Sequence, residues 1–142
     1  MLKTNNQMEA SDLHRSTFSK AERLSSKKII ASLFEAGQSF LIAPLRVIHQ
    51  RTVSNSTCPV QVAITVSKKK FPKAVDRNRI KRLIREAYRI NKHELYKHLT
   101  GNNISIAVII IYTSHSITTF NAMENKIKLV LMRLMQEYDV VA

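Results

Sequence analysis

The chain has 142 residues, of which 44% are hydrophobic, and its 23 Lys and Arg against 10 Asp and Glu give a net charge of +13. A hydrophobic fraction of this size excludes a disordered basic tail, and the length is that of one folded domain. So large a positive charge favours a polyanionic partner, with nucleic acid ahead of an anionic membrane surface.

The sequence pattern contains neither a secretory signal nor a membrane span. The first fifteen residues carry two acids and no apolar core, unlike a signal peptide. The longest apolar run, 106–112, has the length of a strand and falls far short of the roughly 18 residues that a membrane span needs. We therefore expect a cytoplasmic protein that does not associate with membranes.

The N-terminal region predicts a tail followed by a helix. Residues 1–17 are polar and without periodicity, so we expect a flexible tail before a single RNA-binding α/β domain over 18–142. Apolar residues then recur at helical spacing. Ser25 or Ser26 can cap this helix, and Gly37 can end it.

Two strands are predicted after this helix, over 45–51 and 60–66, and a further short strand could lie around 40–43. The first strand alternates between two faces, Leu45, Val47 and His49 on one and Arg46, Ile48 and Gln50 on the other. The second has one apolar face and one small, polar face, made of Gln61, Ala63 and Thr65.

The remaining chain predicts a basic helix over about 74–91, a polar stretch over 91–103 that ends in a turn, a strand over 104–112 and a final helix from Thr119 or Asn121. We expect the two apolar helices, the first and the last, to cover the same face of the sheet. The other face would then stay open and could accept an extended, unpaired RNA strand.

The basic helix has two opposite sides. With about 100° per residue, one side carries four apolar residues, Ile80, Leu83, Ile84 and Ala87. The opposite side and its borders carry Arg77, Asn78, Arg79, Lys81, Arg82, Arg85 and Arg89. A solvated helix face usually mixes charge signs, but only Asp76 and Glu86 dilute these cations, and like charges at this spacing repel. We therefore favour a bound polyanion over a merely solvated face, since guanidinium groups suit phosphate oxygens.

We predict no catalytic side chain and no protein metal site. Cys58 is the single cysteine, so neither a disulfide within the chain nor a cysteine metal cluster can form. His93 and His98 are five residues apart, which separates them by about 140° on a helix and does not suit a shared metal. With only two glycines, a glycine-rich phosphate loop is excluded.

One window of the chain resembles a known family. Lys68 and Lys69 are followed by the stretch 73–82, in which Arg77-Asn78-Arg79 opens the basic helix. This pattern resembles the protein subunit of bacterial ribonuclease P, whose Arg-Asn-Arg signature follows a Lys-Lys element and precedes a basic helix. The resemblance extends over residues 18–138.

The resemblance implies an α+β fold, a two-layer α/β sandwich like that of some ribosomal proteins, with about four strands, three helices and a left-handed βαβ crossover. It also implies that the protein assists an endoribonuclease, ribonuclease P, which removes the 5′ leader from precursor tRNA and whose RNA subunit performs the chemistry. Mg²⁺ would be held mainly by that RNA and the substrate. The implied partners are the catalytic RNA and precursor tRNA, without an obligate protein partner.

The resemblance also implies two sets of site residues, carried over position by position. The first set would bind the catalytic RNA: Lys68, Lys69, Arg77, Asn78, Arg79, Lys81, Arg82, Arg85 and Arg89. The second set would line a cleft for the leader between the first helix and the sheet: Lys20, Arg23, Ile30, Phe34, Arg46 and Ile48. Relatives often have an aromatic residue where Ile30 stands, and Phe34 fits either the cleft or the core.

Two other functions stay open. A ribosomal or general structural RNA-binding protein, without a catalytic partner, would bind structured RNA but have no leader cleft. A DNA-binding module would place the basic helix in a major groove. However, cations with Asn78 as the sole base-reading side chain suit phosphates better than base edges.

Overall fold

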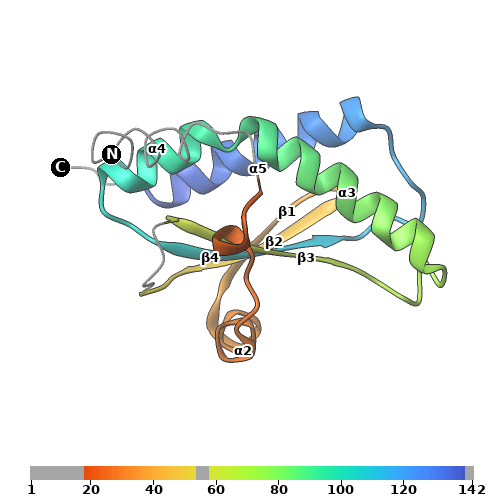
Figure 1. Ribbon diagram of the computed structural model, residues 1–142, viewed down its shortest axis with the longest axis horizontal. Helices are drawn as coiled ribbons and strands as arrows, with labels where there is room; N and C mark the ends of the chain where they lie inside the picture. Colours follow the sequence, from red (N-terminus) through yellow and green to blue (C-terminus); the bar gives the residue numbers. More distant parts are fainter. Residues whose placement is uncertain (1–17, 54–57, 140–142) are drawn as a thin grey trace, which may run out of the picture.

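The computed structural model describes residues 18–53 and 58–139, which form one sheet with helices on both of its faces (Figure 1). The predicted N-terminal tail, residues 1–17, lies outside the described residues. In chain order the elements are the 3-10 helix η1 (Lys20–Glu22), α2 (Lys27–Ala36), β1 (Gln38–Ile42), β2 (Leu45–Arg51), β3 (Val60–Val66), α3 (Ala74–Asn91), α4 (His93–Gly101), β4 (Ile106–Tyr112) and α5 (Phe120–Glu137).

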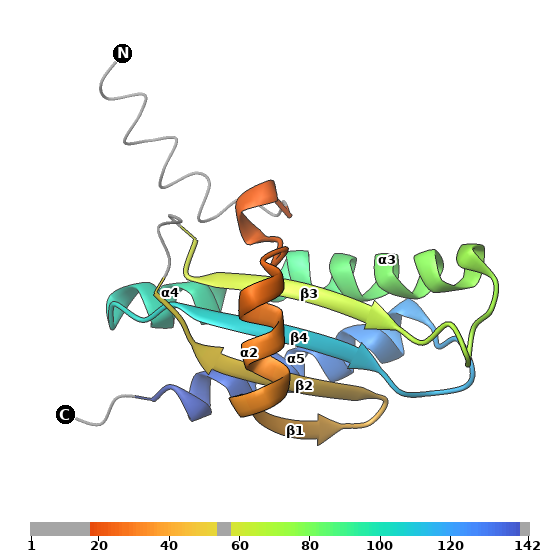
Figure 2. The same ribbon diagram turned by 90° about the horizontal axis from the view of Figure 1, so that it is seen from below.

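The four strands lie in the order β1-β2-β4-β3. β2 pairs antiparallel with both β1 and β4, whereas β3 pairs parallel with β4. Parallel neighbours need a crossover, and here it runs through α3 and α4. Figure 2 shows β3 and β4 pointing the same way with α3 behind the sheet, which makes this crossover left-handed. The predicted fold class is confirmed, including this exception to the usual right-handed crossover.

Helices cover both faces of the sheet, so the expectation that the first and last helices share a face is wrong. α3, α4 and α5 lie on one face and α2 on the other (Figure 1). The reason is in β4: Val108 and Ile110 belong to the core beneath α3 and α5, while Ala107 and Ile109 pack with Leu33 of α2. Because successive residues of a strand point to opposite faces, a strand that is apolar throughout needs cover on both.

Four α-helices lie in the described residues where three were predicted. The additional helix, α4, occupies the stretch interpreted as polar, and it buries Leu95 and Leu99. The short strand around 40–43 exists as β1. Ser26 caps α2 and Thr119 caps α5, each accepting a hydrogen bond from a backbone N–H three residues on. No helix in the described part combines the length and apolar character that crossing a bilayer requires.

Candidate nucleic-acid interface

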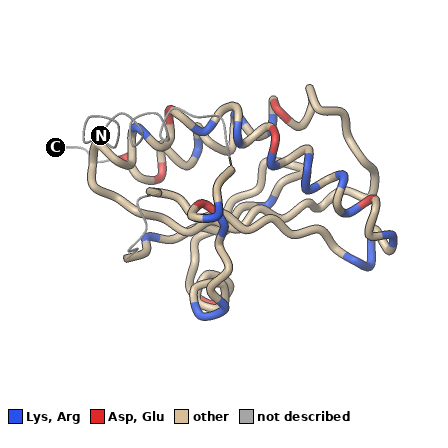
Figure 3. Tube along the Cα trace, viewed as in Figure 1, with Lys and Arg blue, Asp and Glu red and all other residues tan. Residues whose placement is uncertain are grey.

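α3 presents its cations on the side away from the core, as its sequence predicts. Ile80, Ile84 and Ala87 are fully buried. The exposed or partly exposed polar residues opposite them include Asn78, Arg79, Lys81, Arg82 and Arg85. Figure 3 shows basic residues in succession along α3. Within the described ranges, the side chains of Arg79, Lys81 and Arg82 make no hydrogen bond or ion pair, so they can bind an anion without losing a partner.

Two other arginines of α3 already have partners. Nη1 of Arg77 donates to the carbonyl oxygens of Phe71 and Pro72, at 2.9 Å each, and so ties the preceding loop to the helix. Arg89 donates through Nε and Nη2 to the two carboxylate oxygens of Glu86, at 2.8 and 2.7 Å. Both were predicted to contact RNA. The hydrogen bonds of Arg77 hold the loop before α3 in place. The carboxylate of Glu86 partly neutralises the charge of Arg89.

The loop before α3 holds the two predicted lysines at the surface. Lys68 and Lys69 are exposed. Ser67 stabilises the turn, because its Oγ accepts hydrogen bonds from the backbone N–H groups of Lys69 and Lys70. Lys70 points elsewhere: its Nζ donates to the carbonyl oxygen of Thr113 at 2.6 Å. The loop is therefore fixed at several points while its first two lysines remain accessible.

A row of side chains on the α2 face of the sheet is left uncovered. Strand pairing aligns Leu41 with Arg46, Arg46 with Ile111, and Ile111 with Thr65. Leu41 is 63% exposed, Arg46 and Thr65 are exposed, and Ile111 is half-buried. We call this row the open row. It is the remaining part of the sheet face that was predicted to accept an extended strand.

One flank of α2 forms a wall beside the open row. Ser32 accepts a hydrogen bond from Nε2 of Gln50. On the α2 face of β2, Ile48 lies between Gln50 and Arg46, so Ser32 faces away from Arg46. Phe34 is two residues beyond Ser32, about 200° around the helix, so it belongs to the flank towards Arg46. Phe34 is 58% exposed, which excludes the core alternative.

The other predicted cleft residues on α2 and β2 contribute less surface. Ile30, one turn before Phe34, is half-buried and packs against the small core beneath α2. Ile48 belongs to that core and is only 8% exposed, so it supports α2 from below and offers little surface to a ligand. The open row and the flank of α2 that carries Phe34 make up the region in which the leader cleft is predicted, and we call this region the α2 cleft.

Lys20 and Arg23 lie along the outer edge of β3. Arg23 forms a parallel bridge with Val62, and the N–H of Leu24 donates to the carbonyl oxygen of Val62 at 2.9 Å. Both cationic side chains are exposed. This short segment therefore extends the sheet at β3 and carries positive charge from η1 to the start of α2.

Glu22 anchors this segment to α3 and α4 through a buried network that sequence reasoning missed. Its Oε2 accepts hydrogen bonds from Nζ of Lys92 and the hydroxyl of Tyr96, both at 2.6 Å. The Tyr96 hydroxyl also lies 2.8 Å from that of Tyr88. Burial acts to raise the pKa of Glu22, but the hydrogen bonds from Lys92 and Tyr96 outweigh it and hold the pKa below its ordinary value. No local sequence pattern indicates a pair so distant along the chain.

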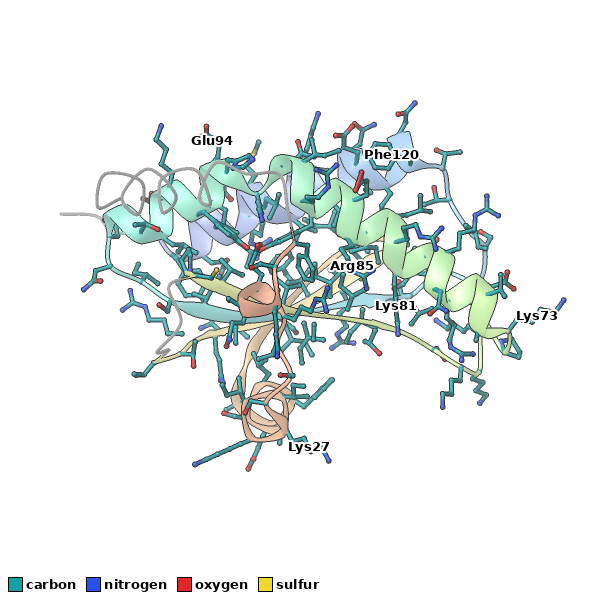
Figure 4. The ribbon with its side chains drawn as sticks, in the orientation of Figure 1. Lys27, Lys73, Lys81, Arg85, Glu94 and Phe120 are labelled. Atoms are coloured by element: carbon teal, nitrogen blue, oxygen red, sulfur yellow. The ribbon has the colours of Figure 1, made fainter. Side chains whose placement is uncertain are left out.

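Phe18, also missed, brings the two predicted sets of residues together. Its ring packs edge-on against that of Tyr88, and the guanidinium groups of Arg23 and Arg85 both lie over it. Figure 4 shows Arg85 and Lys81 extending from α3 towards the β3 side of the sheet. The exposed cations of α3, which we call the basic face of α3, therefore meet the segment that leads into α2 at the edge of β3.

No cluster of metal ligands accompanies these surfaces. Within the described ranges, no three His, Cys, Asp or Glu side chains come together in a way that could hold a metal ion. The residues of this interface are mainly cationic, so they suit phosphates and not Mg²⁺.

Both the sequence and the fold of this chain resemble those of known proteins. The sequence model of the ribonuclease P family matches residues 18–135. The ribonuclease P protein component of Porphyromonas gingivalis is 35% identical over 116 residues, which cover 82% of this chain and 85% of that protein. The corresponding protein of Chlorobium phaeobacteroides is 39% identical over 127 residues, with coverage of 82% and 87%.

Solved structures also resemble this fold, including those of two RNase P proteins. The RNase P protein of Staphylococcus aureus superimposes with a TM-score of 0.64 at 24% identity, covering 81% of this chain and 96% of that one. The RNase P protein of Thermotoga maritima gives a TM-score of 0.63 at 23% identity, with coverage of 79% and 96%.

Proposed function

Because this chain belongs to the ribonuclease P protein family, we propose that it is the protein subunit of a ribonuclease P and assists removal of the 5′ leader from precursor tRNA. The RNA subunit performs the hydrolysis, with Mg²⁺ held mainly by that RNA and the substrate. The protein acts in the cytoplasm by binding both RNAs, and it needs no protein partner.

The basic face of α3 is the proposed contact to the catalytic RNA. The observation that carries this assignment is that Arg79, Lys81 and Arg82 stand on the solvent side of a firmly packed helix without any partner in the described residues. Lys68 and Lys69 extend this surface at the N-terminal end of α3. Phosphate contacts of this kind release counterions, so they contribute affinity that depends strongly on salt.

The α2 cleft is the proposed contact to the leader. An unpaired RNA strand can place phosphates near Arg46 and stack a base on the exposed ring of Phe34. The contribution to the reaction is then binding: cations between two polyanions reduce their repulsion, and a held leader stays in register with the catalytic RNA. The protein's own side chains hold substrate and RNA and transfer no proton.

Reconstitution tests the proposal directly. The purified protein is mixed with a bacterial ribonuclease P RNA, and cleavage of precursor tRNA is measured at a low Mg²⁺ concentration at which the RNA alone is slow. We expect the protein to raise the cleavage rate and to lower the KM for precursor tRNA. A protein that binds this RNA tightly but leaves cleavage unchanged at every Mg²⁺ concentration is a structural RNA-binding protein, and the proposal is then wrong.

A further inference from the structure

Arg23 and Arg85 meet at one aromatic ring, although the family resemblance assigns them to different RNAs. The guanidinium carbon of each lies 5.9 Å from the centroid of Phe18, so the two carbons are at most twice that distance apart. Phe18 is half-buried and its position is fixed by Tyr88, with ring centroids 5.9 Å apart at an interplanar angle of 84°. Two segments that are distant in the sequence thus bring two cations to one place.

No acid neutralises this pair in the described residues. Neither guanidinium group makes a hydrogen bond or an ion pair there, and both side chains are exposed. The neighbouring carboxylates are engaged elsewhere, Glu22 with Lys92 and Glu86 with Arg89. The two charges lie at most about 12 Å apart, close to the Debye length of roughly 8–10 Å, so salt leaves part of their repulsion unscreened. An anion shared by both guanidinium groups would remove that repulsion, and phosphate fits their geometry.

The backbone that carries Arg23 is held rigidly. The residue before it, Glu22, is tied to α3 and α4 by the buried contact to Lys92, and the residue after it, Leu24, is hydrogen-bonded to β3. A buried ion pair carries a desolvation cost, so it is weak as a device for stability alone. Here the ion pair fixes the position of the η1 segment relative to α3. It therefore also fixes the backbone of Arg23 relative to that of Arg85.

The arginine pair lies at the same edge strand, β3, at which the α2 cleft ends. The open row runs across the sheet from Arg46 on β2 to Thr65 on β3, and β3 is the edge strand. Arg23 borders that edge through its bridge to Val62. Arg85 reaches the same edge from α3 on the opposite face (Figure 4). An RNA strand that crosses the sheet along α2 therefore leaves it beside these two side chains.

We propose that Arg23 and Arg85 together bind one phosphodiester group of the unpaired 5′ leader, at the point where the leader passes the edge of β3. The identity of this RNA rests on the proposed function. Arg85 then belongs to the leader path and not to the surface for the catalytic RNA. Phe18 is a positioning residue, because both guanidinium groups lie over its ring.

Holoenzyme affinity for precursor tRNA tests the shared site. The variants Arg23→Ala, Arg85→Ala and the double variant are reconstituted with saturating catalytic RNA and titrated with leaders of increasing length and with mature tRNA. Each single variant should weaken binding of the longer leaders about tenfold, and the double variant should weaken it by little more, because the first substitution already breaks the shared contact. Lys97→Ala, which removes an exposed cation of α4 outside both proposed RNA surfaces, is the matched control and should leave the leader-dependent gain intact.

Leaders with single uncharged backbone linkages identify which phosphodiester group the two arginines bind. Leaders are prepared in which one phosphodiester at a time is replaced by an uncharged methylphosphonate. At one position the wild-type holoenzyme should lose about tenfold in affinity, while the double variant should lose nothing. Independent, multiplicative effects of the two single variants overturn the proposal. The proposal is also wrong if no position exists at which the neutral group weakens binding to the wild type but not to the double variant. An equal loss of affinity for mature tRNA or for the catalytic RNA would overturn it as well.

The same titrations separate this inference from the proposed function. If the wild-type holoenzyme gains no affinity as the leader is lengthened, the leader-binding function itself is wrong. If that gain is present but the arginine pair behaves additively, the function stands and the shared site is wrong.

Discussion

Lys92 and Glu22 form an ion pair inside the protein, with Nζ of Lys92 2.6 Å from Oε2 of Glu22 and side chains that are only 1% and 5% exposed. Glu22 lies in the short 3-10 helix before α2, whereas Lys92 lies between α3 and α4. The pair therefore joins the segment that leads into the α2 cleft to the helix that carries the basic face.

Removing one partner of this pair should destabilise the protein strongly. In Lys92→Met the carboxylate of Glu22 stays buried without its cation, and breaking a buried pair in this way typically costs about 3–5 kcal/mol. Urea denaturation of the two proteins measures this loss. Lys97→Met, which removes an exposed lysine from α4, is the matched control and should change the free energy of unfolding by less than about 0.5 kcal/mol. A Lys92→Met protein as stable as this control would contradict the prediction.

The same pair should appear in the pH dependence of stability. Because the pKa of Glu22 is lowered in the folded protein, its contribution is present above the unfolded-state pKa, near 4.5, and is lost as the pH falls through the lower folded value. The stability difference between wild type and Glu22→Gln should therefore shrink as the pH falls from about 6 towards 3. Glu86→Gln, at a partly exposed pair with Arg89, should give a much smaller change. A difference that stays constant with pH would contradict the assignment.

Periodicity predicted the parts of this fold that depend on local pattern. The apolar spacing of Ile80 and Ile84 places them in the core, and the alternation along β2 places His49 and Arg46 on opposite faces, as observed. Such predictions succeed because burial repeats with the geometry of a helix or a strand. The Lys-Lys and Arg-Asn-Arg pattern likewise led to the family, which the comparisons confirm.

Features that depend on tertiary contacts were missed. The position of α2 on the second face follows from Ala107 and Ile109, whose apolar side chains were interpreted as those of a central strand with one covered face. The Glu22–Lys92 pair and the ring of Phe18 gave no signal, because their partners are distant in sequence. The sequence likewise carries no sign that Arg77, predicted as an RNA contact, donates to two carbonyl oxygens of its own loop.

Arg77 should act on the loop that carries the lysines. In Arg77→Ala the carbonyl groups of Phe71 and Pro72 lose their shared donor, so the loop should open more often. Faster amide hydrogen exchange at Lys69 to Phe71 would report this opening. Arg79→Ala removes an equal charge two residues away, where no partner exists in the described ranges, and should leave exchange in the loop unchanged. Equal exchange in wild type and Arg77→Ala would show that the two hydrogen bonds do not hold the loop.

The basic face of α3 should determine the salt dependence of binding to the catalytic RNA. Each phosphate contact contributes roughly 0.7 to 0.9 log units of affinity per log unit of salt, so Arg79→Ala with Arg82→Ala should reduce the slope by about two contacts. The measurement is a set of binding titrations at increasing salt. Lys97→Ala with Lys128→Ala removes the same charge from exposed positions on α4 and α5 and should leave the slope unchanged. Equal slopes for both double variants would indicate a general charge effect and not a defined surface.

The α2 cleft should distinguish precursor from mature tRNA through Arg46. This residue lies on the open row beside the α2 flank that carries Phe34. Arg51 lies on the same strand, but its position in the alternation of β2 places it on the opposite face of the sheet. In the reconstituted holoenzyme, Arg46→Ala should lower the affinity for precursor tRNA about tenfold and leave mature tRNA and the catalytic RNA unaffected, because a charge-assisted hydrogen bond to a leader phosphate is lost. Arg51→Ala removes the same charge and should not change the gain that a longer leader gives. If the two variants weaken precursor and mature tRNA equally, the open row does not bind the leader, and the cleft must be assigned to another part of the surface.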